Sequence, residues 1–83
     1  MSPRLPQVSG ATVVKLLQEL GYEVTRQRGS HIRLNREVAG EVHHVTVPAH
    51  RVVAKGTLSD ILTAVSRASS VPKSELIERL RGL

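Results

Sequence analysis

The stretch RQRGSHIRLN, residues 26–35, places one histidine, His31, among the arginines Arg26, Arg28 and Arg33. An imidazole, whose ordinary pKa lies near 6.5, can accept or donate a proton near neutral pH. RNA needs no protein nucleophile, because its own 2′-hydroxyl attacks the adjacent phosphorus once a base takes the proton. The guanidinium groups can stabilise the charge that develops there. The same four side chains would also suit simple phosphate contact, and the residues alone leave both interpretations open.

Ser30 precedes His31 and suggests a second kind of chemistry, a serine nucleophile activated by a histidine base. Consecutive residues of a strand point to opposite faces, so the hydroxyl should not meet the imidazole. We expect Gly29 and Ser30 to form a tight turn that supports the site instead.

The remaining histidines, His43, His44 and His50, raise the question of a metal. His43 and His44 should alternate faces, the chain has no cysteine, and its acidic residues are scattered, so we predict no metal site and no cofactor. His50 is a candidate second imidazole or RNA contact, with a plain surface histidine as the alternative.

Lys55 begins the stretch Lys55-Gly56-Thr57, directly before an expected helix. Free backbone N–H groups and the helix dipole favour an anion at such a place, so Lys55 is a candidate phosphate contact. Thr57 as a simple N-cap is the alternative, and both can hold at once.

Length and composition limit the class of protein. The chain has 83 residues, enough for one domain, and 40% of them are apolar. The core must be built from Val, Leu and Ile, because there is no Phe or Trp and Tyr22 is the single aromatic residue. No apolar run approaches the roughly 20 residues of a membrane helix, so we expect a cytoplasmic protein that contacts no membrane.

The charge points to a polyanion as partner. Twelve Lys and Arg against seven Asp and Glu give a net charge of +5, a balance that favours nucleic acid through counterion release. Charge that merely aids solubility is the alternative. One tyrosine cannot supply a stacking platform for bases, so backbone contacts should dominate and base recognition should be weak.

The apolar spacing predicts the elements that position these residues. Residues 1–8 should form an irregular tail, and Ser9 should cap a helix with Val13, Leu16, Leu17 and Leu20 on one face, ended by Gly21. A half-buried strand should follow from Tyr22 to about Arg28, with Tyr22 and Val24 on one face and Glu23, Thr25 and Gln27 on the other.

Two more strands and two helices complete the pattern. We expect a strand over residues 31–35, a turn over 36–40, and a strand over 41–48 that Pro48 ends. Val45 and Val47 should face the core there, and His44 and Thr46 the solvent. A helix capped by Thr57, with Asp60 in a capping-box position, should carry a stripe of Leu58, Ile61, Leu62 and Val65. Pro72 should open a short helix with Leu76, Ile77, Leu80 and Leu83 on one face.

The predicted order is α-β-β-β-α with a short extra C-terminal helix. Two helices on one face of a three-stranded antiparallel sheet make a two-layer α+β domain over residues 9–83.

The pieces LLQELGYEVTRQRGSHIRLN, VTVPAH and KGTLSDIL, in this order and spacing, resemble the HicA family of toxin mRNA interferases. The resemblance implies a fold like that of double-stranded-RNA-binding domains and a ribosome-independent endoribonuclease of a type II toxin–antitoxin system. It also implies a HicB-type antitoxin partner, with any contact to DNA made only through that antitoxin. The family's catalytic histidine is that of the GSH motif, here His31, and Ile32 departs from the family pattern.

Two further functions stay open. One is a non-catalytic RNA-binding module on the same fold, and the other is an interaction domain whose basic face binds an acidic protein.

Overall fold

A computed structural model describes residues 4–83 and contains six regular elements in the predicted order. These elements are α1 (Gly10–Glu19), β1 (Glu23–Arg28), β2 (His31–Val38), β3 (Glu41–Pro48), α2 (Lys55–Ser69) and α3 (Lys73–Arg81). The strands form one antiparallel sheet in the order β1-β2-β3. The predicted α+β fold with an extra C-terminal helix is therefore confirmed.

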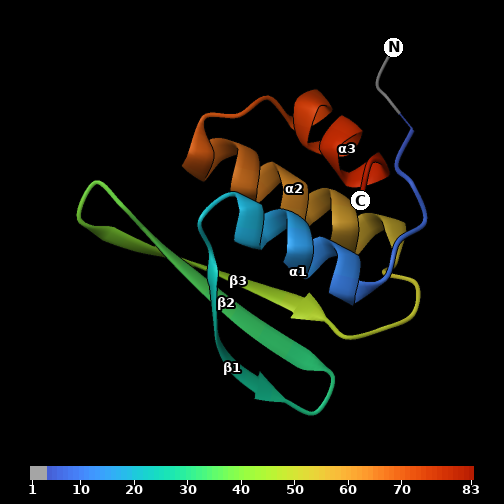
Figure 1. The fold of residues 1–83 in the computed structure, drawn as a ribbon, viewed down its shortest axis with the longest axis horizontal. Helices are drawn as coiled ribbons and strands as arrows, with labels where there is room; N and C mark the ends of the chain where they lie inside the picture. Colours follow the sequence, from blue (N-terminus) through green and yellow to red (C-terminus); the bar gives the residue numbers. More distant parts are fainter. Residues whose placement is uncertain (1–3) are drawn as a thin grey trace.

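The helices cover one face of the sheet and leave the other open (Figure 1). Both α1 and α2 contact β3, and α3 packs on α1 and α2. The core between the layers is aliphatic apart from Tyr22, and it consists of Val13, Leu16, Leu17, Tyr22, Leu34, Val45, Val47, Val53, Leu58, Ile61, Leu62, Val65, Leu76, Ile77 and Leu80. The exposed face, which we call the outer face, is consequently free to carry polar groups.

Helix α1 begins and ends as its sequence predicts. The Ser9 side chain accepts a hydrogen bond from the backbone N–H of Thr12 at 3.2 Å, which satisfies one of the free donors of the first turn. Gly21 follows the helix with a φ of +94°, a left-handed conformation that suits glycine. Val13, Leu16 and Leu17 are fully buried, as the stripe predicts.

Strand β1 differs from the prediction of a half-buried strand. All six of its residues are exposed, and Val24, expected in the core, is 44% exposed. Tyr22 is buried, but it lies just before the strand. The strand residues of the core are Leu34 of β2 and Val45 and Val47 of β3, so the core ends before it reaches the far edge of the sheet.

Three boundaries also differ. The second turn comprises only Ala39 and Gly40, because β2 extends to Val38. Helix α2 begins at Lys55, with Ala54 as its N-cap and no side-chain cap, so neither Thr57 nor Asp60 caps it. Leu83 lies beyond the end of α3 and is 43% exposed, so it is not part of the buried stripe.

The segments before α1 and after β3 lie side by side. The backbone N–H of Gly10 donates to the His50 carbonyl at 2.9 Å, and the N–H of Val53 donates to the Val8 carbonyl at 2.8 Å. Residues 4–9 form no helix or strand, while residues 1–3 of the predicted tail lie outside the described residues. A Cβ at Gly10 would collide with the Pro48 carbonyl, so the close approach of the start of α1 to the end of β3 requires glycine at this position.

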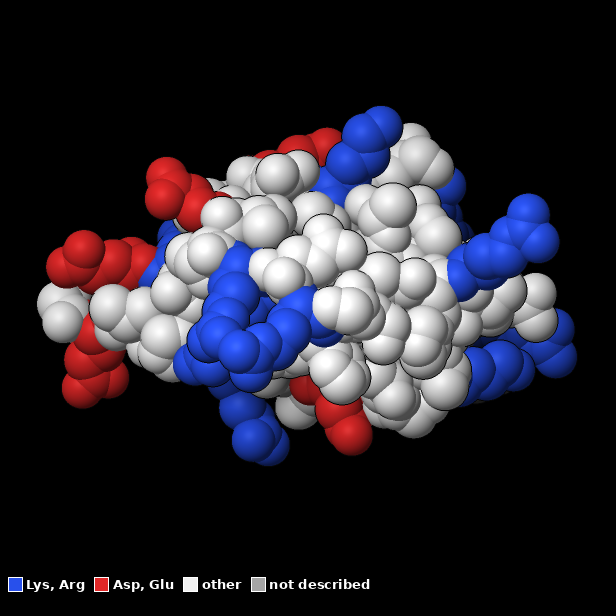
Figure 2. Space-filling model, turned by 90° about the horizontal axis from the view of Figure 1, so that it is seen from below, with Lys and Arg blue, Asp and Glu red and all other residues white. Residues whose placement is uncertain are grey.

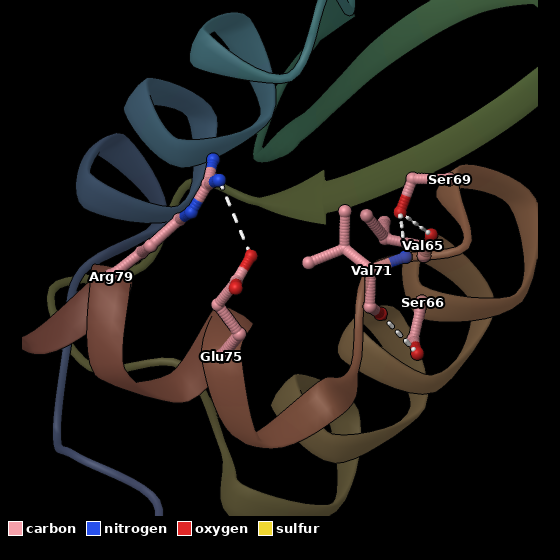
Figure 3. A network of polar contacts seen from close by, with 6 residues as sticks. All are labelled: Val65, Ser66, Ser69, Val71, Glu75 and Arg79. Atoms are coloured by element: carbon pink, nitrogen blue, oxygen red, sulfur yellow. Dashed lines mark hydrogen bonds and ion pairs between the residues drawn. The ribbon is translucent and has the colours of Figure 1, made fainter.

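The turn between α2 and α3 is closed by serine side chains (Figure 3). Ser66 donates to the Val71 carbonyl and Ser69 to the Val65 carbonyl, each at 2.6 Å. An ion pair at 3.3 Å joins Glu75 and Arg79 along the exposed side of α3.

None of the helices in residues 4–83 combines the length and the apolar character needed to cross a membrane.

Candidate functional site

The strand register places the sequence-predicted residues of β1 and β2 together on the outer face. Arg28 is paired with His31, and Arg26 with Arg33. On the other side of β2, Thr46 of β3 is paired with Arg33. Directly paired residues of an antiparallel sheet share a face, with their Cβ atoms about 5 Å apart. His31 and the three arginines therefore project from one small area.

A β-bulge in β1 is responsible for this arrangement. Val24 pairs with Leu34, but the next pair is Arg26 with Arg33, so Thr25 is the extra residue. In a regular strand Thr25 would pair with Arg33, and Arg26 would point toward the helix side with Val24. The prediction that Gln27 shares a face with Glu23 is therefore wrong, since Gln27 pairs with the inward Ile32.

The side chains surround a shallow hollow of about 300 Å³ on the outer face, which is lined by Arg26, Arg28, His31, Arg33 and Thr46. No carboxylate lines it, and every lining residue is exposed. Figure 2 shows Lys and Arg side chains gathered on this side of the molecule, with acidic side chains mainly toward the end at which the β2–β3 hairpin projects. A cationic hollow with an accessible imidazole fits a phosphodiester better than a neutral or cationic ligand.

The turn before His31 is held in place from both sides. Gly29 has a φ of +57°, as a two-residue hairpin turn with glycine in its first position requires. The Ser30 carbonyl accepts a hydrogen bond from the backbone N–H of Ala49 at 2.6 Å, and His31 pairs with Pro48. These contacts fix the backbone of His31 while its side chain stays open to solvent.

Two predicted contacts lie away from the hollow. His50 is exposed in the loop after β3 and does not line the hollow. Lys55 lines a different depression, of about 390 Å³, with Arg4, Leu5 and Gln7. Since α2 begins at Lys55 itself, the residue stands in the first turn of the helix and not before it.

The other two histidines have partners on opposite faces, as alternation predicts. On the helix side, Nδ1 of His43 lies 2.7 Å from the Tyr22 hydroxyl. Burial raises the pKa of that hydroxyl, and the charge of Arg36 offsets part of the effect. The hydroxyl is therefore protonated at neutral pH when it forms this hydrogen bond with His43.

His44 lies on the outer face and is bonded to Asn35, its cross-strand partner, at 2.6 Å. Within residues 4–83, no group of three or more His, Cys, Asp or Glu side chains could hold a metal ion.

The sequence reasoning missed the Asn35–His44 pair and the lining role of Thr46, since both depend on the register of β2 against β3. Alternation alone had placed His44 and Thr46 outward.

Comparison with known proteins agrees with this geometry. The family model described as HicA toxin of bacterial toxin–antitoxin matches residues 10–65, from the start of α1 to well within α2. Neither the curated proteins nor the solved structures that were compared gave a match. The matched segment contains all three strands and more than half of the chain, and the chain therefore belongs to the HicA family of toxins of bacterial toxin–antitoxin systems.

Proposed function

We propose that this toxin is an endoribonuclease that cleaves mRNA independently of the ribosome, with His31 as its catalytic residue. The observation that carries the proposal is the exposed imidazole of His31 in a hollow lined by three arginines and no carboxylate. An RNA backbone can enter such a hollow from solvent. The family membership, which makes the chain a toxin, agrees with this activity.

The proposed reaction is an internal transfer at phosphorus. The imidazole of His31 takes the proton of the 2′-hydroxyl, or gives a proton to the departing 5′-oxygen, and water exchanges the other proton. The 2′-oxygen forms a bond to phosphorus as the P–O5′ bond breaks. Arg28 is the cross-strand partner of His31, and Arg33 lies two residues farther along β2 on the same face. Their guanidinium groups stabilise the charge on the phosphoryl oxygens. The products carry a 2′,3′-cyclic phosphate and a 5′-hydroxyl.

The substrate is held mainly through its backbone. Arg26, Arg28 and Arg33 contact successive phosphates, while His50 and Lys55 remain proposed contacts for a longer RNA outside the hollow. Gly29 and Ser30 hold the turn that positions His31. Residues 9–83 act in this proposal as a single toxin domain.

The toxin family implies a cognate antitoxin. We infer a protein of the HicB type that covers the outer face and presents acidic groups to the arginines. Its association should be fast and should slow as the salt concentration rises, because opposite charges steer the encounter. A complex that leaves His31 open to substrate would contradict direct occlusion.

Cleavage and binding of one RNA by matched variants test the proposal. His31→Ala should lower the cleavage rate by about 10²–10⁴-fold, the range typical of a lost general acid or base, while RNA affinity and fold are kept. Arg67→Ala, which removes an exposed cation on α2, serves as the control and should cleave normally. If His31→Ala binds and cleaves like the wild type, the catalytic assignment is wrong.

The end groups and the metal dependence test the mechanism separately. Cleavage should continue in EDTA, DNA should survive because it lacks the 2′-hydroxyl, and the products should carry cyclic phosphate ends. Products with 5′-phosphate ends, or activity restored only by magnesium, would contradict the internal transfer. Salt-dependent RNA binding without any cleavage would identify a non-catalytic RNA-binding module.

A further inference from the structure

The outer face continues beyond the cationic hollow into a second depression of different chemistry. This depression has a volume of about 510 Å³ and is lined by Gly21, Glu23, Thr25, Asn35, Arg36, Glu37 and Val42. Asn35 follows His31 and Arg33 on the same face of β2, and four residues of strand correspond to about 13 Å. An RNA strand with one phosphate at His31 can therefore reach Asn35 within a few nucleotides.

Unlike the cationic hollow, the second depression carries two carboxylates against one guanidinium, that of Arg36, whose residue pairs with the helix-side His43. Glu23 is paired with Asn35, and Glu37 lies two residues farther along the same face of β2. Within residues 4–83, the ion pairs found lie on α3 and involve neither carboxylate. Unpaired carboxylates repel a phosphate and accept hydrogen bonds from N–H groups.

The orientation of Asn35 is fixed by its neighbour. The Oδ1 atom of Asn35 lies 2.6 Å from Nδ1 of His44, and an amide oxygen only accepts, so Nδ1 carries the proton. This leaves the Asn35 amide nitrogen as a donor and Nε2 of a neutral His44 as an acceptor. No other side-chain hydrogen bond of either residue is found within residues 4–83.

The depression also offers apolar surface for a ring. Val42 of β3 pairs with Glu37 on the outer face and is 52% exposed. A flat base can lie against this side chain while its edge meets polar groups. The exposed Val42, the oriented amide and the carboxylates together match a nucleobase.

We propose that Asn35, held by His44, is a specificity-determining residue that contacts a base of the bound RNA together with Glu23 and Glu37. The chemical class is a base with an exocyclic amino group, namely guanine, adenine or cytosine. Such a group points N–H donors at carboxylates, whereas uracil presents one N–H flanked by two carbonyl oxygens that carboxylates repel. This inference rests on the proposed function, since the RNA must lie across the outer face.

Binding of non-cleavable RNA tests the inference apart from catalysis. The probe is a short 2′-O-methyl oligouridine, compared with the same oligomer carrying a single guanosine, adenosine or cytidine at each position in turn. We expect the wild-type protein to bind the amino-bearing oligomers about tenfold more tightly at one position, as one good base contact provides. Fluorescence anisotropy measures each affinity.

The variants Asn35→Ala and Glu23→Gln/Glu37→Gln should reduce that preference to within about twofold. Glu41→Gln, an exposed carboxylate outside the depression, is the matched control and should keep the full preference. His44→Ala should weaken the preference, and His44→Gln, which can still donate to the Asn35 oxygen, should restore part of it. A merely structural role would show instead as equal loss of affinity for all oligomers.

Two negative outcomes are distinguishable. RNA that is bound and cleaved without base preference, or with a preference that the Asn35 and glutamate variants keep, would overturn the inference and leave the proposed function intact. Absence of binding to every RNA at low salt would overturn both.

Discussion

Strands β1 and β3 are both edge strands paired with β2, but they relate to the core in opposite ways. In β3, Val45 and Val47 are buried beneath the helices, whereas every residue of β1 is exposed. Strand β1 is thus held to the domain mainly by its backbone pairing. A strand that contributes no side chain to the core can carry arginines and a bulge at little cost to stability. Two arginines of the candidate site, Arg26 and Arg28, lie on this strand.

The cross-strand pair of Val24 and Leu34 offers the sharpest test of this comparison. Leu34 is fully buried, so Leu34→Ala should lower the free energy of unfolding by about 2–5 kcal/mol. Val24→Ala, at an exposed position, should change it by no more than about 0.5 kcal/mol. Urea denaturation measures both, and comparable losses would show that β1 does share the core.

Replacing an arginine of β1 should affect binding and not folding. Arg28→Ala should weaken affinity for all RNAs alike and reduce the slope of log affinity against log salt by about 0.7, the value for one phosphate contact on a single strand. Arg67→Ala on α2 should leave the slope unchanged. A salt slope that Arg28→Ala does not alter would exclude a phosphate contact at Arg28.

Tyr22 links the start of β1 to β3 through its hydrogen bond to His43. Tyr22→Phe should cost about 1 kcal/mol at neutral pH, the typical value of one hydrogen bond. Burial in the folded state raises the pKa of the Tyr22 hydroxyl. The stabilisation by the protonated hydroxyl is therefore fully present below its ordinary pKa near 10 and is lost as the pH rises through its pKa in the folded state.

The stability difference between the wild type and Tyr22→Phe should therefore shrink as the pH is raised above about 10. Thermal unfolding at several pH values measures it. A difference that stays constant or grows over that range would contradict a hydroxyl that is protonated in the folded state.

The two hairpin turns provide the smallest expected effect. Ala39 and Gly40 both have positive φ, +52° and +83°, a turn for which Asn-Gly is the preferred sequence. Ala39→Asn should therefore stabilise the domain by up to about 1 kcal/mol. In the other turn only Gly29 has a positive φ, so Ser30→Asn should bring no such gain. A lower melting temperature for Ala39→Asn would contradict the turn geometry.

Much of the fold follows from local patterns. The stripe from Val13 to Leu17, the Ser9 cap and the Gly21 end define α1 without knowledge of its neighbours, because a helix satisfies its hydrogen bonds within itself. The alternation of Val45 and Val47 with His44 and Thr46 similarly determines the inward and outward faces of β3. His31, as an imidazole beside arginines, was recognisable as a candidate catalytic residue from its chemistry and from the GSH motif.

Other features depend on contacts between distant segments. Alternation alone would have turned Arg26 toward the helices, and only the bulge at Thr25 brings it beside Arg33. The pairing of Asn35 with His44 requires the register of two strands, which no single strand contains. Strand alternation predicts Val24 to be a core residue, but its burial depends on whether a helix packs over that part of the sheet. Residue types and periodicity are properties of the chain alone. The strand register and the extent of the core arise from pairing and packing between elements, so they follow only from the folded structure.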